Sequence, residues 1–247
     1  MHILVGRSLG ALFLGGLVVS PSVAQWAELS TTWWLEPSAP PPGIRHLAGK
    51  EHVLKQRLLP AGLTKLGRAV SKAEASFDLP AGTELIQVKG GTGPIFCDGQ
   101  LQKAQGCLLD SDSDRRFDSA FRTWSQTPAL VVINGPMPTK LMTVASPIPY
   151  ENLDPATSTL DAFVAIERRN WFNIYGLESF TILFGSSNNQ ERITDPVQFK
   201  STELPRQLNI LGSNFTVLSE KDGRMAVRVD AAMPRQPFRV TKTISFR

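Results

Sequence analysis

The chain has 247 residues and a formal net charge of +4, from 26 lysine and arginine residues against 22 aspartate and glutamate residues. The basic residues are scattered along the sequence, whereas nucleic-acid binding needs them concentrated on one face. We therefore expect no nucleic acid among the partners. A mild positive excess is compatible with contact with anionic lipid or polysaccharide, and equally with ordinary solubility.

The first 24 residues have the three parts of a secretory signal peptide. Arg7 provides the positive charge, Ser8–Val19 form an apolar run too short to span a bilayer, and Ser22-Val23-Ala24 form a small-residue cleavage site before Gln25. No cysteine follows the apolar run, which argues against a lipid anchor, and no later stretch has the apolar length of a transmembrane helix. The sequence predicts a periplasmic or secreted protein with no transmembrane segment after processing.

Residues 25–50 have the composition of an N-terminal arm rich in tryptophan and proline. Trp26, Trp33 and Trp34 precede a proline run within Glu36–Gly43 that favours an extended backbone and excludes a helix. The tryptophans could form a platform for a ligand. We favour the alternative that they pin the arm onto a domain surface, because aromatic side chains gain most from burial.

Residues 51–247 contain short β-rich runs separated by Gly, Pro, Asn and Asp, which predicts a single β-rich domain. A strand needs alternation of apolar and polar side chains, or a compact apolar run if both faces are buried. The predicted strands are Val53–Leu59, a strand ending at Val88 after the Pro/Gly turn in residues 79–85, Ala129–Ile133, and the run around Phe180–Phe184.

The sequence near the C-terminus predicts a β-hairpin with the loop Lys221-Asp222-Gly223. A three-residue loop makes one face almost wholly apolar, whereas a two-residue Asp-Gly turn would set Val217 opposite Arg228 and Glu220 opposite Met225. The predicted register pairs Phe215 with Val229, Thr216 with Arg228, Val217 with Val227, Ser219 with Met225 and Glu220 with Arg224. A final run, Phe238, Val240 and Thr243–Phe246, is expected to close the sheet against this hairpin.

These patterns together predict an all-β protein, an antiparallel β-sandwich or barrel-like domain with few short helices. The two segments that compete as helices are Leu63–Ala75 and Asp118–Trp124, and the first contains Gly67, which is unfavourable in a helix. An outer-membrane barrel is not favoured, because its strands alternate over about ten residues and the runs here are shorter.

Cys97 and Cys107 are the two cysteines of the chain. In an oxidising compartment a close pair most simply forms one disulfide. A redox pair is usually Cys-x-x-Cys, and a zinc site needs further ligands nearby, and neither pattern is present. We therefore predict a structural disulfide.

Four aspartates follow Cys107 at spacings that resemble a calcium loop. Asp110, Asp112, Asp114 and Asp118 occupy the first, third, fifth and ninth positions of an EF-hand-like loop, and carboxylate oxygens are the ligands that calcium prefers. The sixth position, which is glycine in such loops, is Arg115, and the closing twelfth position is Phe121. The alternative is a polar turn in which the aspartates bond backbone amides, with no cofactor.

No catalytic motif stands out elsewhere. Gly185-Ser186-Ser187 lacks the second glycine of a nucleophile elbow, and His46 and His52, with Glu51 between them, match no zinc motif. A glycan hydrolase needs only two carboxylates in one cleft, and Asp154, Asp161 and Glu167 can be named without a reason to prefer them. Asn214-Phe215-Thr216 matches a glycosylation site within a predicted strand.

We therefore predict an exported, non-enzymatic β domain that acts as an envelope or extracellular binding or structural module. The alternatives are a secreted hydrolase of polysaccharide or cell-wall material, and an adhesion module stabilised by calcium at Asp110, Asp112, Asp114 and Asp118. The expected partners are envelope polysaccharide or protein.

Overall fold

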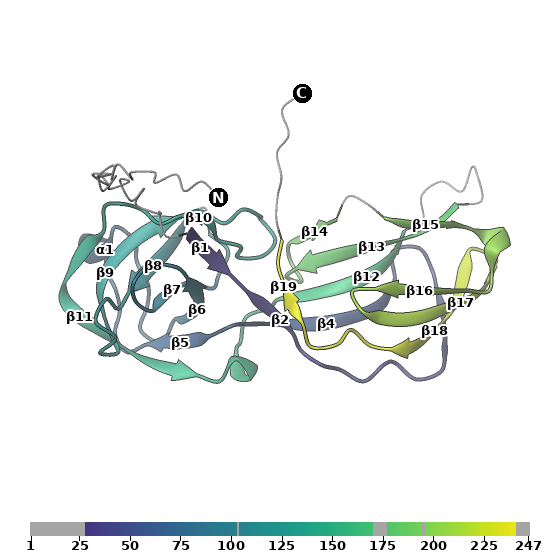
Figure 1. Cartoon of the computed structure of the whole chain (residues 1–247), viewed down its shortest axis with the longest axis horizontal. Helices are drawn as coiled ribbons and strands as arrows, with labels where there is room; N and C mark the ends of the chain where they lie inside the picture. Colours follow the sequence, from purple (N-terminus) through teal and green to yellow (C-terminus); the bar gives the residue numbers. More distant parts are fainter. Residues whose placement is uncertain (1–27, 103, 170–176, 194–195, 241–247) are drawn as a thin grey trace, which may run out of the picture.

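The computed structural model describes residues 28–102, 104–169, 177–193 and 196–240. The protein is nearly all β, with antiparallel sheets, which confirms the predicted fold class. Figure 1 shows two β units side by side along the long axis of the molecule, a barrel and a two-sheet sandwich. The predicted signal peptide, residues 1–24, lies outside the described residues and stays a prediction.

The barrel unit is a closed ring of six strands. Its order is β6-β5-β11-β9-β8-β7, and β7 pairs back onto β6, so no edge is left open within the ring. Strands β1 and β10 extend it beyond β6, and the short helix α1 (Lys72–Ala75) lies against β11. The strands are β1 (Glu28–Thr31), β5 (Leu63–Leu66), β6 (Glu84–Lys89), β7 (Ile95–Asp98), β8 (Gln105–Leu109), β9 (Arg116–Thr123), β10 (Asn134–Pro136) and β11 (Met142–Leu153).

The sandwich unit consists of two facing sheets. One has the order β14-β13-β12-β4-β2-β19, with β15 also paired to β13, and the other has the order β16-β17-β18-β3. The strands are β2 (Trp33–Leu35), β3 (Ile44–Leu47), β4 (His52–Pro60), β12 (Phe163–Arg169), β13 (Leu177–Gly185), β14 (Gln190–Arg192), β15 (Val197–Lys200), β16 (Arg206–Ile210), β17 (Ser213–Lys221), β18 (Arg224–Ala231) and β19 (Pro237–Phe238); the 3-10 turns are η1 (Pro155–Thr157) and η2 (Ser201–Glu203). Phe180 of the first sheet meets Phe215 of the second edge to face, with ring centroids 5.2 Å apart.

A single hydrophobic cluster joins the two units. It includes Ile86 and Phe121 from the barrel strands and Leu58 and Phe184 from the sandwich strands. Strand β1 of the barrel passes into β2 of the sandwich with only Thr32 between them, and β4 passes into β5 within two residues. We call this shared core and its crossing strands the seam.

Trp33 lies at the centre of the seam. It is 2% exposed, and its indole Nε1 donates a hydrogen bond to the carbonyl of Val131, 2.9 Å away. Of the segment predicted to be an arm, residues 28–47 supply β1, β2 and β3, one strand to each of three sheets. Trp33 is therefore pinned by burial, as we favoured, whereas the boundary between an arm and a domain at residue 50 stays a prediction.

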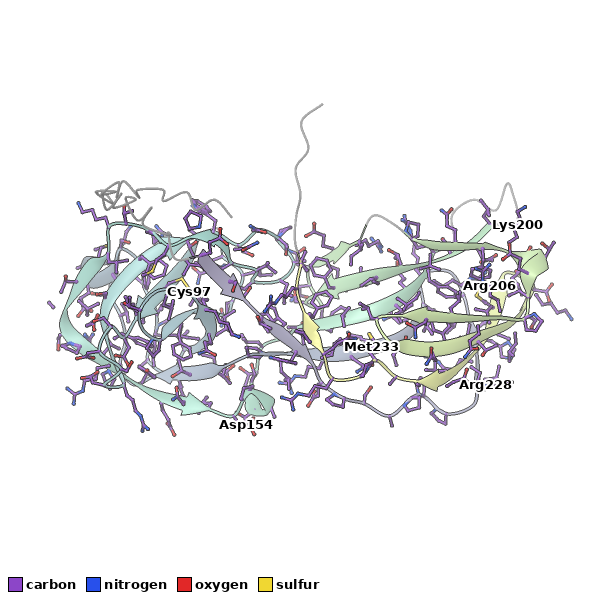
Figure 2. The ribbon with its side chains drawn as sticks, in the orientation of Figure 1. Cys97, Asp154, Lys200, Arg206, Arg228 and Met233 are labelled. Atoms are coloured by element: carbon purple, nitrogen blue, oxygen red, sulfur yellow. A yellow bond between two sulfur atoms is a disulfide. The ribbon has the colours of Figure 1, made fainter. Side chains whose placement is uncertain are left out.

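Gln56 of β4 links two segments of the sandwich unit, one that follows β2 and one that precedes β19. Its side chain is 3% exposed; the Nε2 donates to the carbonyls of Glu36 and Met233, and the Oε1 accepts from the backbone N–H of Met233. Figure 2 places Met233 where the two units meet. A buried amide satisfied on both sides holds these segments at fixed positions.

The prediction of a strand at Ala129–Ile133 is wrong. All five side chains are at most 5% exposed, yet the segment pairs with no strand. Its backbone N–H groups bond to side chains, since the Oγ of Ser125 accepts from Val132 N–H and the Oγ1 of Thr31 accepts from Ile133 N–H. The carbonyls of Val132 and Ile133 accept from isolated backbone N–H groups of Gln126 and Thr31. The segment is a loop buried in the seam, which an apolar run of strand length does not distinguish from a strand.

The C-terminal hairpin is present with a different turn. The pairs of Phe215, Thr216 and Val217 with their predicted partners are confirmed. Beyond them the register shifts, so Ser219 opposes Ala226, Glu220 opposes Met225, and Lys221 opposes Arg224 across the two-residue turn Asp222-Gly223. Both turn residues have positive φ, 53° and 74°, as a tight hairpin turn requires. A bulge at Leu218, which the predicted register lacks, reconciles this two-residue turn with the apolar face.

One further expectation needs correction. Phe238 lies in β19, which pairs with β2 in the seam and not with the hairpin; residues 243–246 lie outside the described residues. The two segments that competed as helices are mostly not helical, in line with the predicted fold class: most of Asp118–Trp124 forms β9, and Leu63–Ala75 contains strand β5 followed by the one-turn helix α1.

The disulfide between Cys97 and Cys107 is present and links directly opposed residues of β7 and β8. Both cysteines are fully buried in the seam core, on the same face of the barrel as Ile86. The bridge therefore fixes two strands of the barrel where they contribute to the shared core.

Arg168 connects the two sheets of the sandwich. It is 1% exposed, and its guanidinium donates to the carbonyls of Leu47 in β3 and Gly223 in the hairpin turn, each 2.7 Å away. It also forms a 3.2 Å ion pair with buried Glu178. A buried charge held by this many acceptors specifies how the second sheet sits on the first.

Replacing Arg168 with Met is expected to lower the free energy of unfolding by about 3–5 kcal/mol, because a buried ion pair loses one partner and two carbonyls lose their donor. The matched control is Arg228→Met, which removes the pair between Arg228 and Asp230 on the exposed face of β18 and should cost less than about 1 kcal/mol. Urea unfolding of both variants measures the difference. Equal losses would contradict the role given to Arg168.

Candidate functional site

The aspartate loop, residues 110–118, connects β8 to β9 and is organised around the carboxylate of Asp110. This residue is fully buried. Its Oδ1 accepts from the backbone N–H of Asp114, and its Oδ2 accepts from the N–H of Arg115 and from the hydroxyl of Tyr150, 2.8 Å away. These bonds fix the loop, because a buried carboxylate needs several donors.

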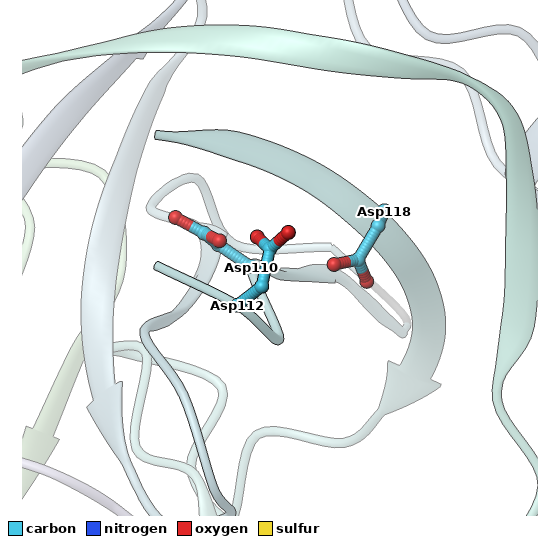
Figure 3. A group of neighbouring side chains, drawn as sticks. All are labelled: Asp110, Asp112 and Asp118. Atoms are coloured by element: carbon cyan, nitrogen blue, oxygen red, sulfur yellow. The ribbon is translucent and has the colours of Figure 1, made fainter. Parts of the chain in front are cut away.

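Three of the four predicted calcium ligands come together. Carboxylate oxygens of Asp110, Asp112 and Asp118 lie within 4.8 Å of one another (Figure 3). Asp114 is not part of this group, and its Oδ1 accepts from the backbone N–H of Arg116. The sequence spacing thus predicted the convergence of three carboxylates but not the separate role of the fourth.

Hydrogen bonds hold the aspartate loop in its conformation, as bound calcium does in an EF-hand. Arg115, at the glycine position, has a positive φ of 69°, and its N–H is held by Asp110. Phe121, at the closing position, is 3% exposed in the seam core and cannot supply a ligand. The arrangement supports the interpretation as a polar turn.

Asp118 closes the loop from the start of β9. Burial raises the pKa of its carboxyl, but hydrogen bonds from the hydroxyl and backbone N–H of Ser111 outweigh burial, and the pKa lies below its ordinary value. Its Oδ1 is buried and has no hydrogen-bond partner within the described part of the chain. This oxygen, together with the convergence of the three carboxylates, favours a cation.

The other sequence candidates do not gather in one place. Asp154 caps the turn η1, Asp161 accepts from the N–H of Ser187, and buried Glu167 pairs with Arg192 at 3.0 Å. Ser186 forms a tight turn with Asn189. Each of these groups therefore has a structural partner of its own.

His52 lies on β4 near Glu167. Partial burial lowers the pKa of its imidazole, and the nearby Glu167 only partly offsets that effect. His46 lies in β3, an edge strand of the other sheet. The two histidines thus form no common metal site.

The sequence analysis missed an open groove where the two units meet. It has a volume of about 460 Å³ and is lined by residues of three separate loops: Leu101, Gln102, Ser125, Gln126, Thr127, Pro128 and Asn189. In Figure 1 the loop after β9 reaches across to β13 and β14 of the sandwich. We call this feature the junction groove.

The junction groove has a rigid wall. The hydroxyl of Ser125 donates to the carbonyl of Leu130, and the Oγ1 of Thr127 accepts from the N–H of Leu130. Across the groove the side-chain amide of Asn189 donates to the carbonyl of Pro128. At the base of this contact Gly185 has a φ of 137°, and a Cβ there would lie 2.3 Å from the carbonyl oxygen of Asn189, so the turn requires glycine.

A buried carboxylate supports one side of the junction groove. Asp98 is 1% exposed, accepts from the backbone N–H of Gln100, and accepts from the side-chain amide of Gln102. Burial raises the pKa of Asp98 above its ordinary value of 3.8, and the bond from Gln100 only partly offsets this effect. Asp98 therefore positions Gln102 at the groove.

Comparison of the chain with protein-family models, curated proteins and solved structures finds no match. The function is therefore argued from the residues themselves. Within the described residues, no helix combines the length and apolar character that crossing a membrane requires.

The aspartate loop yields a test of the calcium hypothesis. We expect 10 mM calcium to leave the thermal midpoint of the mature protein unchanged, because two backbone N–H groups and the Tyr150 hydroxyl already satisfy the central carboxylate of Asp110. The variant Asp110→Asn should lose about 1–3 kcal/mol of stability. Asp112 is exposed and accepts one 3.3 Å hydrogen bond, from the N–H of Asp114. Replacing it with Asn should change the free energy of unfolding by less than about 0.5 kcal/mol. A rise of several degrees with calcium, absent in Asp112→Asn, would establish a calcium site.

Asp98 yields a prediction for pH. Because its pKa is raised, the folded protein binds more protons than the unfolded chain at pH values just above 3.8, so this group's contribution to stability falls as pH rises through that window. The free energy of unfolding of Asp98→Asn, taken relative to that of the wild type, should therefore increase as pH rises. Asp118 is the control, because its pKa is lowered and its contribution to stability rises with pH. The free energy of unfolding of Asp118→Asn, taken relative to that of the wild type, should therefore decrease as pH rises. Urea unfolding between pH 3 and 7 measures both trends, and parallel trends would contradict the assignment.

Proposed function

We propose that this chain is an exported, non-enzymatic binding module for envelope or extracellular material. Export is supported by the signal-peptide pattern of residues 1–24 and by the disulfide between Cys97 and Cys107. The observation that carries the binding role is the junction groove, whose described lining combines amide, hydroxyl and apolar side chains and includes no ionisable group. Such linings orient a ligand without supplying an acid or a base.

Rigidity is the second support for a binding role. The junction groove is formed by loops of both units, and the seam fixes these units relative to each other through its shared core and the hydrogen bond from Trp33 to Val131. A preorganised surface loses little conformational entropy when it binds.

The hydrolase alternative needs two carboxylates facing one cleft. A second groove of about 350 Å³ lies between β4 and the start of β12 and is lined by Lys55, Arg57 and Asp161 among others. Asp161 is the one carboxylate in its described lining, and it already accepts from Ser187. This groove therefore supports the alternative less well than the junction groove supports binding.

A calcium-stabilised adhesion module remains the second candidate function. The convergence of Asp110, Asp112 and Asp118 and the unpartnered Oδ1 of Asp118 favour it. In that case calcium would stiffen the barrel and would not form the ligand contact itself, because the aspartate loop does not line the junction groove.

The proposed function predicts that the mature protein co-sediments with insoluble envelope polysaccharide and releases no reducing sugar from it. Binding should survive 0.5 M sodium chloride, because the described lining of the junction groove holds no charged side chain. The measurement is the sedimented fraction at 0.1 and 0.5 M salt, together with a reducing-sugar assay of the supernatant. Loss of binding at high salt would indicate attraction by net charge alone, and sugar release abolished by Asp161→Asn would indicate a hydrolase.

A further inference from the structure

We propose that the junction groove binds an uncharged, hydroxyl-rich saccharide, with Trp124 as the apolar surface against which a sugar ring packs. This inference rests on the proposed function and names its ligand class. It is argued from the hydrogen-bonding groups that the groove leaves free, from the exposure of Trp124, and from the backbone that forms the lining.

The amide side chains of the groove offer acceptors. The nitrogens of Gln102, Gln126 and Asn189 are engaged, by Asp98, by the carbonyl of Asn134 and by the carbonyl of Pro128. The oxygens of Gln102 and Asn189 accept no hydrogen bond within the described part of the chain and are the acceptors open to a ligand, whereas the oxygen of Gln126 is buried without a partner. Acceptors in such a setting favour a ligand that donates O–H or N–H bonds, and they disfavour anions.

Trp124 supplies the apolar surface. It is 64% exposed, the highest exposure among the large hydrophobic side chains of the described residues. It directly precedes Ser125 of the groove wall, and its neighbour Thr123 pairs with Gln105, three residues after Gln102. Trp124 does not itself line the groove but adjoins its lining along the chain. A sugar ring is apolar on its C–H face and polar at its edge. A solvent-exposed tryptophan next to hydrogen-bonding groups can pack against the first while those groups bind the second.

The lining disfavours a peptide. An extended peptide binds best by pairing with the free edge of a strand. The groove residues 101–102, 125–128 and 189 all lie outside the strands, in loops whose Ser125 and Thr127 hydroxyls are already bonded. The groove therefore offers side-chain amides to a ligand and no ladder of main-chain groups.

The test titrates the mature protein with two neutral probes, cellohexaose and hexa-N-acetylchitohexaose, by isothermal calorimetry up to 10 mM. We expect saturable binding of at least one probe. Trp124→Ala should weaken it at least about tenfold and Gln102→Ala about threefold. Both residues are exposed, so the variants keep the fold. Ile44→Ala removes another exposed apolar side chain, on β3 of the sandwich, and should leave binding unchanged.

Two results would overturn the inference: no saturable binding of either probe, or equal binding by wild type and Trp124→Ala. A hexapeptide that binds where the saccharides do not would overturn it as well. Co-sedimentation of Trp124→Ala with envelope polysaccharide distinguishes the two proposals. If the variant still sediments like wild type, the binding function stands and the saccharide site lies elsewhere; if wild type does not sediment, the proposed function itself fails.

Discussion

The contact on which the rest of the structure depends is the burial of Trp33 between the barrel and the sandwich. Its indole donates to Val131 in the buried loop, while its backbone pairs with β4 and with β19 near the end of the described chain. Two pairs of consecutive strands, β1–β2, which carries Trp33, and β4–β5, run from one unit into the other. Because one hydrophobic cluster contains residues of both units, neither can move without exposing apolar surface of the other.

The seam also determines where a ligand can bind. The buried loop at residues 129–133 is anchored by Thr31 and Trp33, and its preceding residues 125–128 form the wall of the junction groove. The opposite side comes from the β13–β14 turn, held against Pro128 through Asn189. The polar groove is thus a consequence of packing a loop between two β units, and its stiffness derives from the same core. The aspartate loop, by contrast, is stabilised locally through Asp110 and Tyr150.

The sequence predicted what depends on near neighbours. Period-two alternation identified β4 and β13, the cysteine spacing identified the disulfide, and the apolar face of the hairpin determined its register up to Val217. It did not predict features that depend on distant contacts. The run at Ala129–Ile133 resembles a buried strand until Thr31 and Trp33, about a hundred residues away, satisfy its backbone. The junction groove brings Gln102, Gln126 and Asn189 together from three loops with no shared spacing, so no local pattern reveals it.

The central claim is that the seam makes the barrel and the sandwich one cooperative structure that presents the junction groove. Differential scanning calorimetry of the mature, oxidised protein tests this most directly. We predict a single unfolding transition whose calorimetric and van't Hoff enthalpies agree, because the shared core must break when either unit unfolds. Two resolved transitions, or a calorimetric enthalpy well above the van't Hoff value, would show that the units unfold independently and would contradict it.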